Sequence, residues 1–381
     1  MNDYLEELEQ GLKKREEQGL LRRLKDARGV DFTSNDYLGL SSDPSIRESL
    51  QTYLEDGDLG APASRLLRGN HSEHTDVERE FANFKGDEAA LLFSSGFQAN
   101  LGMLTGLIGR HDRVLSDELN HASLIDGLRL SRAKRIVFPH LDLEALEARL
   151  ARPHEQGRTF VLVESLFSMD GDVAPLDRIA QITSRYGGLL IVDEAHATGV
   201  YGETGAGLID SFGVRDEVLA TASTCGKAFG LAGAFITGSQ LVIDHLVNHA
   251  RSFIYSTAPM PLLSRAIRRA IEIVRSAPER RARVAELSKR LRLRLRDLGV
   301  QTALVNSPIV SVLLGDQHRA LSVSRLLWER GYDVRALRPP TVPEGTSRLR
   351  ISVHSNHTPE EIDGLADAVS ESSKACPGAL S

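Results

Sequence analysis

Short apolar runs alternate with helix-forming stretches between about Asp76 and Gly238, and no other feature restricts the fold as strongly. Runs of this length, separated by helices, predict β-α-β units and therefore a mainly parallel sheet with helices on both faces. We expect an α/β fold whose functional residues gather at the C-terminal ends of the strands. The predicted strands are Ala89–Phe93, Arg113–Leu115, Arg135–Phe138, Phe160–Val163, Leu189–Val192 and Val218–Ala222.

The chain before and after this region has a different pattern. Leucines near helical spacing predict an amphipathic helix over residues 4–28, and an Arg- and Leu-rich stretch predicts a long helix over Pro261–Leu298. Further strands are expected at 309–314, 333–335 and 348–353, with helices at 319–330 and 359–370 and a frayed tail after Ser372. We therefore predict an N-terminal helix and arm (1–50), a large domain (51–285) and a small α+β C-terminal domain (286–381).

Composition excludes several functional classes. The 381-residue chain has a net charge of −6, which argues against a general binder of nucleic acid or anionic membranes. Its acidic N-terminus does not resemble a secretory signal, and no apolar stretch reaches the ~18 residues that a membrane span needs. Two distant cysteines, Cys225 and Cys376, indicate a reducing compartment, so we expect a cytoplasmic protein.

Two charged residues stand at the C-terminal ends of predicted strands. Asp193 follows the run Leu189–Val192, and Lys227 lies in a small-residue turn that closes the run Val218–Ala222. A pyridoxal phosphate (PLP) enzyme needs such residues: the lysine forms a Schiff base, and the carboxylate keeps the pyridine nitrogen protonated. The two residues therefore predict a PLP site at this edge of the sheet.

The cofactor's phosphate requires backbone N–H groups at a helix N-terminus and a few hydroxyl groups. The segment Phe93–Asn100 has the pattern of a strand end, a glycine turn and a helix, while Thr224, Ser256 and Thr257 could supply hydroxyls. Each signal is weak alone, because Ser/Gly turns and Thr caps are common. Their coincidence with Asp193 and Lys227 supports the prediction.

Two histidines and two arginines are further candidates. His121 follows a strand and could stack on a cofactor ring or cap a helix, and His196 lies three residues past Asp193, within reach of the same ring. Arg348 and Arg350 are two residues apart on one predicted strand and therefore point to the same face. One of them could bind a carboxylate with its guanidinium fork.

Other motifs favour structural interpretations. His71 and His74 have a spacing that could bind a metal, but no third ligand is evident. Cys225 is interpreted as a small packed residue rather than a nucleophile. The letters Asp193-Glu194-Ala195-His196 match a DEAH-box ATPase, yet the phosphate loop that such a motor needs upstream is missing.

Taken together, these motifs resemble those of the α-oxoamine synthase family, PLP enzymes of fold type I, over about residues 12–370. The motifs that carry the resemblance are Ser34–Leu40, Ser95–Asn100, Asn120–Ser123, Glu164–Asp172, Asp193–His196 and Gly226–Ala228. The resemblance implies a large domain with a mainly parallel seven-stranded sheet, a small α+β C-terminal domain, and a homodimer that shares its active sites.

The resemblance also implies roles for individual residues. Lys227 is expected to bind the cofactor covalently and to act catalytically with His121, which stacks on the ring, and Asp193, which pairs with the ring nitrogen. The expected cofactor-binding set is Gly96, Phe97, His121, Ser168, Asp193, His196, Thr224, Lys227 and, from a partner subunit, Thr257. The expected substrate-binding set is Arg22, Asn35, His121, Thr341 and Arg350.

The implied reaction is a decarboxylative condensation of an amino acid with an acyl thioester. Within the family, Arg338–Pro343 followed by Ser347–Arg350 favours L-alanine and a pimeloyl thioester of CoA or of an acyl carrier protein, as in biotin biosynthesis. Glycine or serine in place of alanine remains open, as does a non-catalytic scaffold subunit, although Lys227, Asp193 and His121 are all present. A plain aminotransferase is disfavoured, because it would be expected to bind a second carboxylate.

Overall fold

The computed structural model describes residues 1–303 and 305–376, and they form two compact units. The larger unit contains residues 35–168 and 172–282, and the smaller contains 1–34, 169–171 and the chain from 283 onward. The predicted N-terminal arm is thus divided, because residues 1–34 belong to the smaller unit and residues 35–50 to the larger one. None of the described helices is long and apolar enough to cross a membrane.

The larger unit is built on the predicted α/β sheet, which has seven strands in the order β2-β8-β7-β6-β5-β3-β4. All neighbouring strands are parallel except at β8, which is antiparallel to both β2 and β7. The strands are β2 (Ala89–Phe93), β3 (Arg113–Asp117), β4 (Lys134–Phe138), β5 (Thr159–Glu164), β6 (Leu189–Asp193), β7 (Val218–Thr224) and β8 (Ala234–Gly238). The six predicted strands are confirmed, and β8 is an additional strand that the sequence analysis missed.

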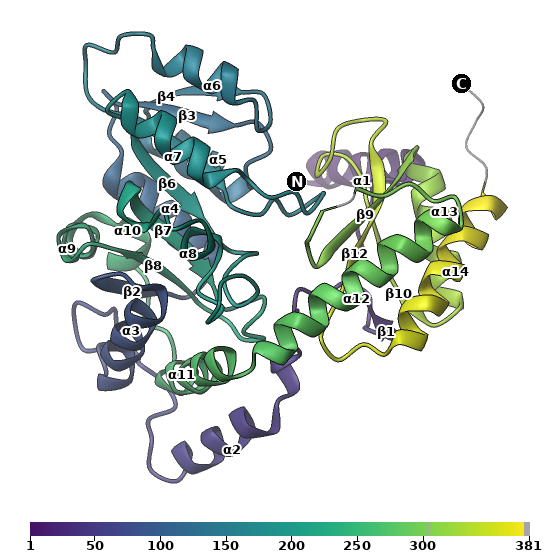
Figure 1. The fold of residues 1–381 in the computed structure, drawn as a ribbon, viewed down its shortest axis with the longest axis horizontal. Helices are drawn as coiled ribbons and strands as arrows, with labels where there is room; N and C mark the ends of the chain where they lie inside the picture. The colour runs from purple at the N-terminus through teal and green to yellow at the C-terminus, as the bar shows by residue number, and fades with distance from the viewer. Residues whose placement is uncertain (304, 377–381) are drawn as a thin grey trace. The chain divides into compact units, whose positions relative to one another are not determined.

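Helices cover both faces of this sheet (Figure 1). Leu91, Phe160 and Ile191 pack on one face against α4, α5 and α9, and the alternate residues Val161 and Val192 are buried as well. Burial on both faces explains why these strands are continuous apolar runs. The helices of this unit are α2 (Pro44–Tyr53), α3 (Ser72–Lys85), α4 (Gly96–Leu107), α5 (Ala122–Ser131), α6 (Leu143–Leu150), α7 (Leu176–Arg185), α8 (Leu208–Phe212), α9 (Gln240–His249), α10 (Arg251–Ile254) and α11 (Pro261–Ser276).

The smaller unit has the predicted α+β composition. Its antiparallel sheet has the order β11-β12-β9, with β9 (Ile309–Gly315), β11 (Arg335–Leu337) and β12 (Ser347–Ser352), and β1 (Val30–Asp31) pairs separately with β10 (Tyr332–Asp333). Apolar residues of the sheet pack with α13 (Gln317–Glu329), α14 (Pro359–Ala375) and the later part of α12 (Pro278–Asp297). Leu349 is buried in this core, between Arg348 and Arg350 on the strand.

Three predicted helix boundaries are wrong. The first helix, α1 (Asn2–Glu17), ends well before residue 28, because Gly19 takes the left-handed conformation and its N–H closes the last turn on Glu16. The predicted helix over 261–298 is two helices, separated at Ala277, since a residue before proline disfavours the helical conformation. Helix α14 continues past Ser372 to Ala375, with Cys376 as its C-cap, and residues 377–381 of the predicted frayed tail lie outside the described residues.

Candidate active site

A cavity of about 170 Å³ lies at the C-terminal ends of β5, β6 and β7, beside the N-termini of α4 and α5. Many of the predicted site residues, which come from distant parts of the chain, meet here. Those that line the cavity are Gly96, Phe97, His121, Asp193, His196, Thr224 and Lys227, together with Ala99, Asn100, Ser123, Glu164, Ala195, Ala222, Ser223 and Gly226.

Asp193, at the end of β6, presents a carboxylate whose hydrogen-bond donors are neutral. Its Oδ2 accepts from Asn100 Nδ2 at 2.8 Å and its Oδ1 from the Ala195 N–H at 2.8 Å. Asn100 also donates to Ser123 at 2.9 Å, so its amide holds the carboxylate from the first turns of α4. A buried carboxylate held by neutral groups favours a cationic ligand nearby. A protonated pyridine nitrogen has the required charge.

His121 acts as the N-cap of α5, which is the alternative role that the sequence left open. Its Nδ1 accepts from the Ser123 N–H at 3.2 Å, and its ring lines the cavity. Burial lowers the pKa of His121, an effect that Asp193 partly opposes. A neutral ring with Nδ1 as acceptor carries its proton on Nε2. Capping uses one ring nitrogen and leaves the face of the ring for a ligand.

Glu164, at the end of β5, is a cavity residue to which the sequence analysis assigned no role. It is buried, and its Oε1 accepts from the His121 N–H at 2.6 Å. Burial and the neighbouring Asp193 raise the pKa of Glu164 well above its usual range, against the opposing effect of Lys227. Glu164 therefore favours the protonated form, which can donate a hydrogen bond into the cavity. Its position after an apolar run is the signal that also identified Asp193.

His196 lies at the end of a short hydrogen-bonded chain. Its Nδ1 is 2.7 Å from the hydroxyl of Tyr37, which donates to Asn35 Oδ1 at 3.2 Å. The Tyr37 hydroxyl thus bonds to both Asn35 and the His196 ring, and the tautomer of the imidazole decides which partner is the donor in the shorter contact. Tyr37 is fully buried, so it fixes the ring of His196 and links it to Asn35.

The first turn of α4 and the end of β7 together have the chemistry of an anion site. Ser95 caps α4 by accepting from the Gln98 N–H at 3.3 Å, and a Cβ on Gly96 would lie 3.6 Å from Thr224 Oγ1. Thr224 Oγ1 also accepts from the Gly226 N–H at 3.2 Å. A helix N-terminus beside a hydroxyl suits a phosphate group. The donor set around the cavity therefore fits PLP at both its ring and its phosphate.

Lys227 is half-buried in the turn that follows β7. The Gly230 N–H closes the turn on the Lys227 carbonyl at 2.8 Å, and a Cβ on Gly230, which has φ +65°, would lie 2.2 Å from the backbone nitrogen of Ser41. The turn is thus held against residues 40–41. Burial raises the pKa of the neighbouring Cys225 thiol, which agrees with a packed residue rather than a nucleophile.

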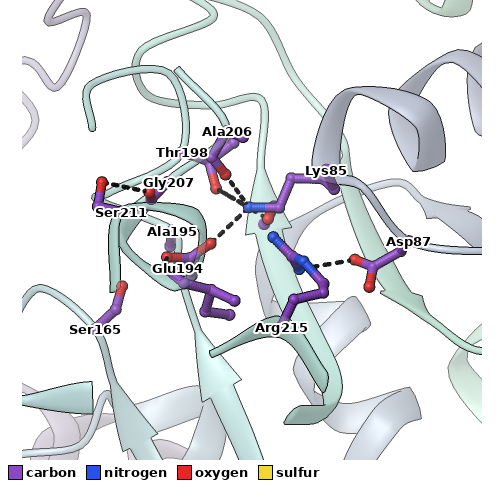
Figure 2. A network of polar contacts seen from close by, with 12 residues as sticks. Lys85, Asp87, Ser165, Glu194, Ala195, Thr198, Ala206, Gly207, Ser211 and Arg215 are labelled. Atoms are coloured by element: carbon purple, nitrogen blue, oxygen red, sulfur yellow. Dashed lines mark hydrogen bonds and ion pairs between the residues drawn. The ribbon is translucent and has the colours of Figure 1, made fainter. Parts of the chain in front are cut away.

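Glu194, next to Asp193, belongs to a separate and fully buried network (Figure 2). Lys85 Nζ, from the end of α3, lies 2.6 Å from Glu194 Oε2 and donates to Thr198 Oγ1 at 3.2 Å and to the Ala206 carbonyl. Thr198 in turn lies 3.0 Å from Ser223 Oγ, and Ser223 lines the cavity. This network fixes the segment after β6 from behind the cavity.

The remaining predicted residues do not line the cavity. Ser168 lies on the segment after β5, and Thr257 is exposed and forms an isolated bridge with Ser64. Arg22, Thr341 and Arg350 belong to the smaller unit, where Arg22 donates to Thr341 Oγ1 at 3.2 Å and Arg350 donates to Ser352 Oγ at 2.9 Å.

The possible metal ligands have structural partners. His74 Nδ1 accepts from the His71 N–H at 3.1 Å, and its Nε2 lies 2.9 Å from the Pro259 carbonyl. Within residues 1–303 and 305–376 no group of three or more His, Cys, Asp or Glu residues could hold a metal ion.

Sequence comparisons agree with this site. Residues 27–369 match the family model for aminotransferase class I and II. An 8-amino-7-oxononanoate synthase from Lysinibacillus sphaericus is 40% identical, over 94% of this chain and 96% of that protein. A second synthase of that name, from Anaeromyxobacter dehalogenans, is 45% identical over 89% and 85% of the two chains.

Solved structures of related enzymes have a similar fold. A serine palmitoyltransferase from Sphingomonas wittichii has a TM-score of 0.88 at 30% identity, covering 91% of this chain and 88% of that one. An 8-amino-7-oxononanoate synthase from Francisella tularensis has a TM-score of 0.80 at 31% identity, covering 92% and 99%. The chain therefore belongs to the aminotransferase class I and II family, as a PLP-dependent enzyme of the α-oxoamine synthase group.

Proposed function

We propose that the protein condenses L-alanine with a pimeloyl thioester, of CoA or of an acyl carrier protein, to give 8-amino-7-oxononanoate, CO2 and the free thiol. The observation that carries the proposal is the 40–45% identity, over most of the chain, to synthases of that name. The cavity that contains Lys227, Asp193 and His121 agrees with this chemistry.

The cofactor, when bound, supplies an electron sink that stabilises negative charge on the amino acid's Cα. Asp193, oriented by Asn100, would keep the pyridine nitrogen protonated, and the ring of His121 would contact the cofactor. Lys227 would hold the cofactor covalently, and its Nζ, when free, would be the base that takes up the Cα proton of the amino acid.

The substrate groups are assigned to the residues that the family resemblance indicates. Arg350 and Asn35 bind the amino acid's carboxylate, and Asn35 is oriented by the Tyr37 hydroxyl. Arg22 and Thr341 bind the acyl thioester. The hydrogen bond between Arg22 and Thr341 supports assigning them to one substrate. Glycine or serine is the alternative amino acid, and the likeness to serine palmitoyltransferase favours serine among these.

Thiol release tests the substrates directly. Purified protein loaded with PLP is supplied with pimeloyl-CoA, or pimeloyl carrier protein, and with L-alanine, glycine or L-serine; palmitoyl-CoA is the control acyl donor. We expect thiol release with L-alanine and a pimeloyl thioester, and a product with the mass of 8-amino-7-oxononanoate. Thiol release only with L-serine and palmitoyl-CoA would contradict the proposed substrates and favour serine as the amino acid.

We also propose a homodimer in which Thr257 of a second copy binds the phosphate. Thr257 is exposed and does not line the cavity of its own chain. Mixing inactive Lys227→Ala and Thr257→Val variants should restore activity, because a mixed dimer would contain one intact site. If both variants are monomeric, or if the mixture shows no activity, the shared site is contradicted.

A further inference from the structure

His140, outside the cavity, lies between two carboxylates. It follows β4, and its Nδ1 is 2.9 Å from Asp117 Oδ1 at the end of β3, while its Nε2 contacts Asp172 Oδ2. Asp117 is buried and also accepts from the backbone N–H groups of Leu119 and Leu141, both at 2.9 Å. The Asp117 carboxylate is therefore held in a fixed position, from which it orients the His140 imidazole toward Asp172.

Asp172 belongs to the segment Ser165–Val173, which folds back on itself after β5. The Phe167 N–H donates to the Asp172 carbonyl at 3.0 Å, and Leu166 forms a bridge with Val173. The ring of Phe167 meets the His140 imidazole edge-on, with centroids 4.5 Å apart. His140 thus contacts both arms of the segment, one through charge and the other through an aromatic edge.

This segment starts at the cavity and has a second anchor at its tip. It directly follows Glu164, which lines the cavity, and it carries Ser168, a predicted cofactor-binding residue. Its tip, residues 169–171, belongs to the smaller unit, where Asp170 forms an ion pair with Arg348. Within the larger unit, the ion pair between His140 and Asp172 anchors the returning arm of this segment, and a charged anchor of this kind holds a segment in one conformation.

The charge on His140 is maintained by its surroundings. The facing groups are the carboxylates of Asp117 and Asp172, and Glu118 accepts from the His140 backbone N–H at 2.9 Å. Burial opposes the charged form, but hydrogen bonds to the two aspartates raise the pKa of His140 to about 10. The side chain is therefore an imidazolium at neutral pH, able to donate to both carboxylates at once.

We propose that His140 is a positioning residue for the cofactor: its bridge between Asp117 and Asp172 holds the Ser165–Val173 segment so that Glu164 and Ser168 are correctly placed. The inference rests on the proposed role of the cavity, and it does not depend on which amino acid or thioester is used. His140 itself does not line the cavity.

Cofactor-free protein provides the first test, because amide exchange reports the segment directly. In His140→Gln we expect the hydrogen-bonded amides of Phe167 and Ala174 to exchange at least about tenfold faster than in the wild type. The matched control is His154→Gln, which removes a half-buried imidazole bonded to the His111 carbonyl and should leave these amides unchanged. Unchanged protection in His140→Gln would overturn the proposal.

PLP binding provides the second test. His140→Gln and Asp172→Asn should each raise the Kd for PLP about tenfold, and the double variant should be little weaker than either, because both remove one bridge. If His140→Gln does not fold, the Kd for PLP of Asp172→Asn tests the proposal alone. Variants with a lower melting temperature but the wild-type Kd for PLP would contradict the proposal, because His140 would then stabilise the fold without positioning the cofactor. Wild-type protein that binds PLP without releasing thiol would refute the proposed substrates and leave this result standing.

Discussion

Two adjacent acidic residues at the end of β6 have opposite environments. Asp193 faces the cavity, is held by the neutral donors Asn100 and Ala195, and shares the cavity wall with Lys227. Glu194 is fully buried and bonded to Lys85, a lysine whose side chain is also fully buried. We call Asp193 and Lys227 the cavity set, and Glu194 and Lys85 the buried pair.

The difference shows how to separate functional from structural charge in this fold. The buried pair satisfies itself: Glu194 also accepts from the Ile209 N–H at 2.9 Å, and Lys85 also donates to Thr198 and Ala206. Such a network stabilises one conformation and has no requirement for a ligand. The cavity set lines a space that a ligand can fill, which is where a cofactor is expected to bind.

The largest expected effect is on the cavity set. Lys227→Ala should reduce condensation by about 10⁴-fold or more, because both the covalent attachment and the proton acceptor are lost. Lys227→Arg keeps the charge and should be as inactive. Both variants should keep the wild-type melting temperature of the cofactor-free protein, measured by circular dichroism. Residual activity above a few per cent in Lys227→Ala would contradict the assigned role.

The buried pair should respond in the opposite way. Lys85→Met leaves the Glu194 charge without its partner, so the free energy of unfolding should fall by about 3–5 kcal/mol. Adding Glu194→Met should restore much of this loss. Urea unfolding of the cofactor-free protein measures both changes. Arg185→Met, which removes a surface ion pair with Glu147, is the control and should cost less than about 1 kcal/mol. A Lys85→Met protein as stable as the wild type would show that the pair is dispensable.

A smaller effect is expected at the residue that orients the cavity carboxylate. Asn100→Ala removes the donor to Asp193, so the Kd for PLP should rise about tenfold, or about 1.4 kcal/mol. Asn248→Ala is the matched control, because the exposed Asn248 amide donates to the Asp244 carbonyl at 2.8 Å within α9. Equal PLP affinity in the two variants, titrated by absorbance, would mean that Asp193 needs no support from α4.

The smallest effect concerns pH and the His140 bridge. The folded-state pKa of about 10 lies above the usual ~6.5, so the charge stabilises the native protein. The stabilisation is complete below pH ~6.5 and is lost as pH rises through about 10. The difference in unfolding free energy between wild type and His140→Gln should therefore shrink from pH 6 to pH 10. A difference that stays constant over this range would show that the charge contributes nothing.

Much of the fold was predictable, because the relevant signals are local. Six strands of the large sheet follow from apolar runs, whereas β8 is a short run directly after the glycine-rich turn of Lys227, and its antiparallel direction breaks the alternation. The end of α1 at Glu17, just before the left-handed Gly19, and the break at Ala277 depend on backbone conformations that helical periodicity does not report.

The site was predictable where a residue ends a strand or begins a helix. Asp193, Lys227, Thr224 and Gly96 were found in this way, and all line one cavity. Asn100 and Tyr37 lie in the motifs Ser95–Asn100 and Ser34–Leu40 but were assigned no role, because their partners Asp193 and His196 are 93 and 159 positions away in sequence. Pairings at that separation are created by the tertiary fold, and no local pattern indicates them.

One measurement tests the central difference between the two acidic residues. Asp193→Asn and Glu194→Gln are compared side by side for the unfolding free energy of the cofactor-free protein and for the Kd of PLP. We expect Asp193→Asn to bind PLP at least about tenfold more weakly at unchanged stability, and Glu194→Gln to lose about 3 kcal/mol of stability. An Asp193→Asn protein that binds PLP normally, or that is destabilised as much as Glu194→Gln, would contradict the account.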